Sequence, residues 1–184
     1  MTKKQRKLQK EVADLLVLLR LVPDVAPVDP DLRTVHLELA KRKLITGAVL
    51  GEYLLVDEHL SNEMCREFFP DRSYTKLWRT KRFQAFNYHI LERLYLVQKV
   101  EFVRARIRLP KEIYKDILAL NDLRNALAHS FFPENRRVKP RWKGVDIFSE
   151  EAFEEFWNDM ARVSDFFVRR ITQRGGRNKT SSGG

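Results

Sequence analysis

The 184-residue sequence has little of what makes tight turns and cross-links: it holds seven Gly, seven Pro and one Cys. So few Gly and Pro favour long helices over a turn-rich β fold. The single Cys65 excludes a disulfide within the chain, and no Cys and His residues stand at the spacing of zinc ligands. We also find no internal repeat and no glycine-rich phosphate loop. From these absences we expect neither a metal site nor a cofactor.

Long apolar runs are also missing. No stretch approaches the roughly 18 apolar residues of a transmembrane helix. Basic residues at 3–7 precede an apolar run, as in a signal peptide, but Asp14 and Arg20 break that run and no cleavage site follows it. We therefore expect a cytoplasmic protein without a membrane partner, built as a single domain over residues 1–173 with a flexible polar tail over 174–184.

Positive charge is concentrated at the two ends of the chain. The formal net charge is +10, and residues 1–10 and 169–184 each hold five basic residues and no acidic one. The remainder, residues 11–168, has 25 basic and 25 acidic residues. The ends are typical of segments that bind phosphate backbones without sequence preference, and they are equally typical of solvated termini.

Apolar periodicity and capping residues predict an all-α fold, a bundle of about five helices. We expect a first helix over 3–21, a long one that begins at Pro30 and runs towards Leu60, a short one capped by Ser61, and further helices over 73–97, 110–129 and 149–171. Residues 103–109 alternate apolar residues with arginines, which indicates an extended segment, although the run also fits the end of a helix. Residues 130–148 are predicted to be irregular.

The helix over 110–129 carries the most informative residues. Arg124 interrupts an otherwise apolar stripe at helical spacing, formed by Ile113, Ile117, Leu120 and Leu127. A guanidinium in such a stripe needs a partner, water or a subunit interface. Asn125 and His129 are four residues apart and share another face.

This combination fits metal-independent cleavage of RNA. An imidazole can take the proton of a 2′-hydroxyl or protonate the leaving 5′-oxygen, and a guanidinium can stabilise the charge that grows on the phosphate. A structural interpretation stands beside it. The helix dipole favours a His near the C-terminus, and Arg124 pairs in that case with Asp122 or an acid on another helix.

Residues 123–129, LRNALAH, resemble the signature of the HEPN superfamily (higher eukaryotes and prokaryotes nucleotide-binding domains). There an Arg and a polar residue precede a His, with four to six residues between Arg and His, late in a helix of an all-α bundle. The rest of the chain matches only in length and helical character. Catalytic members are metal-independent endoribonucleases that act as homodimers, many of them toxins or phage-defence effectors, whereas others are inactive adaptors or regulators.

The resemblance implies that Arg124 and His129 are catalytic and that Asn125 supports them. It further implies an RNA substrate, a homodimer with a composite site, and an antitoxin or regulatory protein as partner. One toxin branch has a Tyr two residues after the His, which a partner enzyme nucleotidylates. This chain departs from that branch, because it has Phe131 at that position and so lacks the hydroxyl that is nucleotidylated.

A basic loop precedes the last predicted helix and surrounds one aromatic residue. Its candidate RNA-binding residues are Arg136, Arg137, Lys139, Arg141, Trp142 and Lys143. Cations that pair with phosphates beside an aromatic that stacks on a base are typical of single-strand binding. The alternative is a solvated loop with Trp142 packed against the body of the protein. Two rivals to the ribonuclease hypothesis therefore remain: a non-catalytic interaction module and a nucleic-acid-binding regulator.

Overall fold

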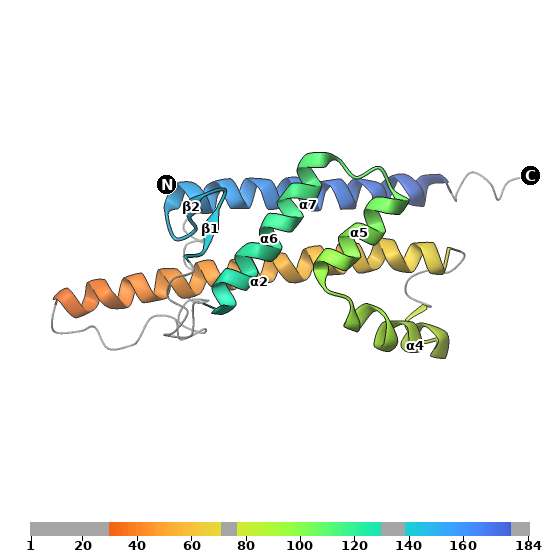
Figure 1. Ribbon diagram of the computed structural model, residues 1–184, viewed down its shortest axis with the longest axis horizontal. Coiled ribbons are helices and arrows are strands. Elements are labelled where there is room, and N and C mark those ends of the chain that lie inside the picture. Colours follow the sequence, from red (N-terminus) through yellow and green to blue (C-terminus); the bar gives the residue numbers. More distant parts are fainter. Residues whose placement is uncertain (1–29, 71–76, 130–138, 178–184) are drawn as a thin grey trace, which may run out of the picture. The chain divides into compact units, whose positions relative to one another are not determined.

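The computed structural model describes residues 30–70, 77–129 and 139–177. The fold is all-α, as predicted, with one very small two-stranded sheet (Figure 1). The elements are α2 (Pro30–Phe68), α4 (Lys81–His89), the 3₁₀ turn η1 (Leu91–Arg93), α5 (Leu96–Arg106), α6 (Lys111–His129), β1 (Arg141–Trp142), β2 (Val145–Asp146) and α7 (Glu150–Arg177). Within these ranges no helix is both long and apolar enough to cross a membrane.

The chain divides into two compact units, residues 1–48 and 49–184, and the boundary falls inside α2. In the first unit the described residues are the start of α2, where Ala40 and Ile45 are buried and Leu39 and Leu44 are exposed. The second unit holds every other described element. The single domain predicted over residues 1–173 stays a prediction, and α7 continues to Arg177, four residues into the predicted tail.

In the second unit, α5 and α6 lie side by side, and α6 also packs on α7 (Figure 1). The β1–β2 hairpin contacts both α6 and α7. Apolar residues from these helices and from α2 form the core, and its largest fully buried side chains include Trp142, Phe156, Phe167, Leu60 and Leu120. This packing fixes the buried face of α6, and with it the position of the Arg124 motif.

Helix starts that have a local capping signal are predicted correctly. α2 begins at Pro30, and α7 begins after Ser149, whose hydroxyl accepts the N–H of Ala152 at 3.3 Å. The α6 helix begins beside Pro110, whose carbonyl accepts the N–H of Tyr114 at 3.0 Å. At α7 the capping residue itself supplies the partner for a free backbone N–H of the first turn.

Two helix predictions are wrong. Ser61 does not cap a new helix, because α2 continues to Phe68 and buries Met64 and Cys65. The helix expected over 73–97 is broken: Thr80 caps α4, and α5 begins at Leu96. Its predicted cap, Ser73, lies outside the described residues.

The alternation over residues 103–109 does not mark a strand up to Arg106, because α5 includes Val103 and ends at Arg106. Extended backbone begins at Ile107, with φ −128° and ψ 152°. Residues 103–106 are thus the end of a helix, which was the alternative interpretation of this run. Part of the predicted irregular loop is also ordered, as the β1–β2 hairpin.

Candidate functional site

Arg124 lies at the margin of the buried face of α6. Leu120, Leu123 and Leu127 around it are buried, Asp122 and Ala128 are exposed, and Arg124 itself is half-buried. The helix therefore presents its apolar stripe to the core and the Arg124 side chain to the edge of that core. The position is neither sealed nor fully solvated.

The contacts of Arg124 are with neutral groups. Its Nη1 donates a hydrogen bond to the Oδ1 of Asn125 at 3.1 Å, and its guanidinium carbon lies 5.4 Å from the centre of the Tyr53 ring on α2. Among the described residues, no carboxylate lies within 4.0 Å of this guanidinium, so neither Asp122 nor another helix supplies the expected acid. The side chain is thus held in place while its charge stays uncompensated by a described acid.

Tyr53 is a member of this site that the sequence did not single out. Burial raises the pKa of the Tyr53 hydroxyl, and the neighbouring Arg124 charge lowers it in part. The ring offers its face to the guanidinium, a favourable cation–π arrangement. A Tyr in α2 has no local signal that links it to a motif some 70 residues later, because the contact exists only after the two helices pack.

His129 is the last residue of α6. Its side chain, together with Phe131, Arg136 and Arg137, lies outside the described residues. Asn125 is half-buried and accepts the Arg124 hydrogen bond. The structure therefore brings Arg124, Asn125 and Tyr53 together.

Trp142 of the predicted RNA-binding loop is fully buried. Its indole N–H donates to the Oδ2 of Asp159 at 2.9 Å, and its ring meets Phe156 edge-on at 5.1 Å. It is therefore packed against the body, the alternative considered above, and is not presented for stacking on a base. Lys139 and Arg141 are exposed.

Lys143 belongs to a cluster of charges between the hairpin, α6 and α7. Its Nζ lies 2.6 Å from Asp159 and 3.2 Å from Glu155, while Arg162 contacts Asp116 at 2.6 Å and Asp159 at 2.7 Å. Its ammonium is thus engaged by protein carboxylates. We conclude that Trp142 and Lys143 fasten the hairpin to the helices.

The two buried acids of this cluster are shifted in opposite directions. Burial raises the pKa of Asp116, and the Arg162 hydrogen bond offsets only part of that effect. Burial also acts to raise the pKa of Asp159, but hydrogen bonds from Lys143 and Trp142 outweigh it, so this pKa lies below its usual value. The stronger partners of Asp159 explain the difference.

A sequence signal for this cluster does exist. Asp116 and Asp159 interrupt apolar stripes of α6 and α7, just as Arg124 does, and so does Lys99 in α5. Each of those three interruptions is matched by an opposite charge on another element. Arg124 is the interruption for which the described residues hold no such partner.

Within the described ranges, no three His, Cys, Asp or Glu side chains gather in a way that would hold a metal ion. Comparisons with protein families, with curated proteins and with solved structures gave no match. Membership of the HEPN superfamily stays a prediction from residues 123–129.

Proposed function

We propose that this protein is a metal-independent endoribonuclease of the HEPN type, with Arg124 and His129 as its catalytic residues. The observation that carries the proposal is the half-buried Arg124 guanidinium, held by Asn125 and Tyr53 and without a described carboxylate partner. A buried or half-buried charge normally has a protein counter-charge. A substrate phosphate would supply it here.

The chemistry needs only groups that the motif offers. The imidazole of His129 takes the proton of a 2′-hydroxyl, and the 2′-oxygen attacks the adjacent phosphorus. The bond from phosphorus to the 5′-oxygen breaks, and a protonated imidazole gives its proton to the leaving oxygen. Arg124 stabilises the additional negative charge on the phosphate, for which its fork of N–H donors is suited. The products are a cyclic phosphate and a free 5′-hydroxyl.

The proposal includes a homodimer. Arg124 and His129 are five residues apart and therefore about 140° apart around an ideal helix. Two copies of the motif, brought together across a cleft, would place the Arg of one and the His of the other on the same phosphate. An antitoxin or regulatory partner, and a role as a toxin or in phage defence, belong to the same proposal.

The test is incubation of mixed RNAs in EDTA with the wild type, Arg124→Ala, Arg124→Lys and His129→Ala. We expect cyclic-phosphate products from the wild type, a loss of about 100- to 1,000-fold for Arg124→Ala, and a loss of about 100- to 10,000-fold for His129→Ala. Arg124→Lys keeps the charge but loses the two-pronged geometry, so it should not restore the rate. Asp122→Ala, an exposed neighbour on α6, is the matched control and should retain activity.

Thermal unfolding of the same variants separates catalysis from packing. If His129→Ala lost activity together with several kcal/mol of stability, the His would be a structural residue. A purified wild-type dimer that leaves diverse RNAs intact and instead binds a protein would refute the enzyme and favour the interaction module.

A further inference from the structure

A basic surface lies on α4 (Lys81–His89), the residues just before it and the turn that follows it. We call it the α4 patch, and its members are Arg79, Lys81, Arg82, Tyr88, Arg93 and Tyr95. All six side chains are exposed. Over residues 77–95 the sequence has these four cations and one acid, Glu92, whose carboxylate accepts a hydrogen bond from Asn87 at 2.6 Å.

The helix under the patch is anchored through its opposite face. Phe83 and Phe86 are buried, and both meet Phe69, which follows the end of α2, at 6.2 and 5.3 Å between ring centres. Thr80 fixes the start of the helix by accepting the N–H of Phe83 at 3.2 Å. The exposed residues of α4 therefore project from a helix whose opposite face is packed against the core.

The cations of the patch have no acidic partner in the described part of the protein, although the Arg82 guanidinium lies 5.3 Å from the centre of the Phe69 ring. In the described part of the chain, Arg79, Lys81, Arg82 and Arg93 have no carboxylate within 4.0 Å. Lys99, Arg162 and Arg170 of the same unit all have one. Lys81 and Arg82 also lie in the first turn of α4, where the helix dipole disfavours positive charge, so helix stability does not explain their presence.

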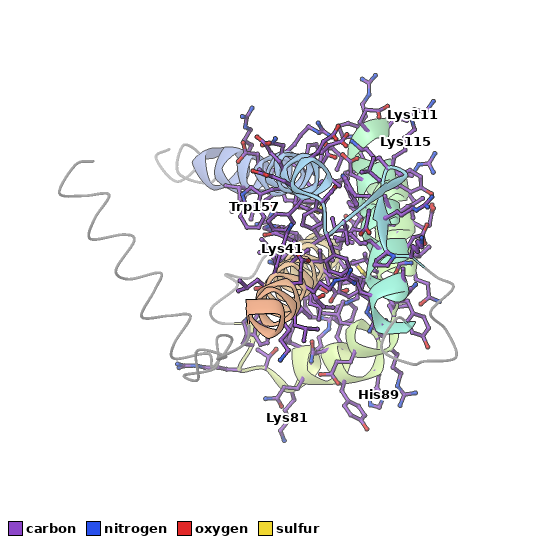
Figure 2. The ribbon with its side chains drawn as sticks, turned by 90° about the vertical axis from the view of Figure 1, so that its left-hand side faces the viewer. Lys41, Lys81, His89, Lys111, Lys115 and Trp157 are labelled. Atoms are coloured by element: carbon purple, nitrogen blue, oxygen red, sulfur yellow. The ribbon has the colours of Figure 1, made fainter. Side chains whose placement is uncertain are left out.

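Exposed aromatic rings stand among these charges. Tyr88 is 59% exposed and Tyr95 is 76% exposed. Lys81 and Tyr88 are seven residues apart, hence on one face of the helix, and the Arg93 guanidinium lies 5.9 Å from the centre of the Tyr88 ring. Figure 2 shows Lys81 and His89 projecting from α4 at the lower edge, with Lys111 and Lys115 of α6 at the upper edge.

We propose that the α4 patch binds single-stranded nucleic acid, with its cations on the phosphates and Tyr88 and Tyr95 stacked on bases. Unpaired cations interleaved with exposed rings are the combination that single strands recognise, because every base has a stacking face and every nucleotide has a charge. A duplex keeps its bases stacked on each other and cannot use the tyrosines. Binding at this patch does not rest on RNA cleavage.

The test measures fluorescence anisotropy of labelled 12-mers of single-stranded RNA, single-stranded DNA and duplex DNA with the full chain. The DNA lacks the 2′-hydroxyl, so its binding is measured without cleavage. We compare Lys81→Ser/Arg82→Ser with Lys111→Ser/Lys115→Ser, which removes the same charge from α6. The patch variant should bind single strands about tenfold more weakly, and its salt dependence should fall by about 1.4 in slope for two lost phosphate contacts.

The contribution of the two tyrosines to binding is tested against an exposed aromatic residue elsewhere on the protein. Tyr88→Ala and Tyr95→Ala should each weaken single-strand binding by about fivefold or more, whereas Trp157→Ala, an exposed aromatic of α7, should not. Equal losses in the patch and control pairs would overturn the proposal, because they would indicate only the overall charge of the protein. Tighter binding to duplex DNA, or to vesicles of phosphatidylserine and phosphatidylcholine with the same dependence on Lys81 and Arg82, would overturn it too.

Failure of the two proposals can be told apart. Patch-dependent binding of single-stranded DNA without any cleavage of RNA would refute the ribonuclease and leave the α4 patch standing. Cleavage of RNA that Lys81→Ser/Arg82→Ser leaves unchanged, together with unchanged DNA binding, would refute the patch alone.

Discussion

A buried indole needs apolar neighbours for its ring and a hydrogen-bond acceptor for its N–H, and Trp142 has both. Its carbon face meets Phe156, and its N–H is satisfied by the carboxylate of Asp159. A buried donor without a partner would cost free energy, so the position requires both the ring and the acid. At the scale of single residues, the chemistry of this chain is decided by what each side chain meets after folding.

Trp142→Phe should lower the free energy of unfolding by about 1 to 3 kcal/mol, because Asp159 loses a donor and the smaller ring leaves unfilled space. The measurement is urea unfolding followed by circular dichroism. Trp157→Phe is the control, because Trp157 is 51% exposed and should change stability by no more than about 0.5 kcal/mol. Equal effects of the two substitutions would contradict the assigned role of Trp142.

Cys65 gives a prediction about pH. Burial raises the pKa of its thiol to about 11, and the nearby Lys99 charge opposes that rise. The ordinary pKa of the thiol is 9.0, so at pH values between 9.0 and about 11 the unfolded chain releases a proton that the folded chain keeps. Stability should therefore fall as the pH rises, by about 1 kcal/mol at pH 10.

Urea unfolding at pH 8 and pH 10 tests this dependence, with Cys65→Ala as the reference that lacks it. The chain has one cysteine, so a thiol reagent reports on Cys65 alone. We expect the native protein to react slowly at pH 8 and the unfolded protein to react at once. Rapid labelling of the native state would show that the thiol is not buried.

At the scale of elements, the strained turn of the β1–β2 hairpin places a lysine ammonium beside acidic side chains of α7. Its two central residues, Lys143 and Gly144, have φ angles of 45° and 92°. Gly adopts such angles freely and Asn does so readily, but Lys rarely does. The turn nevertheless holds Lys, whose ammonium reaches Asp159 and Glu155.

The substitution Lys143→Asn compares the contribution of the turn to stability with the contribution of the ion pairs. The turn preference alone predicts a gain in stability, whereas the loss of the cation beside the buried Asp159 predicts a loss of about 1 to 2 kcal/mol. We expect the net change to be a loss, measured as a lower midpoint in urea. Lys139→Asn, just before the hairpin and exposed, should be nearly neutral. A stabilised Lys143→Asn protein would show that the ion pairs contribute little.

At the scale of the whole molecule, buried charges connect the helices of the unit formed by residues 49–184. The Nζ of Lys99 on α5 donates to both carboxylate oxygens of Asp57 on α2, at 2.8 and 2.7 Å, and to Ser61 at 3.1 Å. Arg170 on α7 reaches Glu63 on α2 at 3.4 Å. Such pairs fix which helix faces meet, since a buried charge without its partner is costly.

The Lys99–Asp57 pair should respond asymmetrically to substitution. The Lys99 side chain is 5% exposed and that of Asp57 is 30% exposed. Asp57→Asn leaves a buried ammonium without its counter-charge and should cost about 3 to 5 kcal/mol. Lys99→Met fills the same space and leaves an acid that water can reach, so its cost should be smaller by about 2 kcal/mol or more. Thermal and urea unfolding measure both, and equal costs would contradict the burial of Lys99.

The sequence by itself determined the all-α class and the starts of α2, α6 and α7, because caps and apolar periodicity act within one or two helical turns. It also marked Arg124 as a charge in an apolar stripe. It did not separate Arg124 from Asp116 and Asp159, which break their stripes in the same way. Only the tertiary structure decided that Asp116 meets Arg162, 46 residues away, and that Trp142 is buried against Asp159. Partners so distant along the chain leave no local pattern, since their meeting depends on how the helices pack.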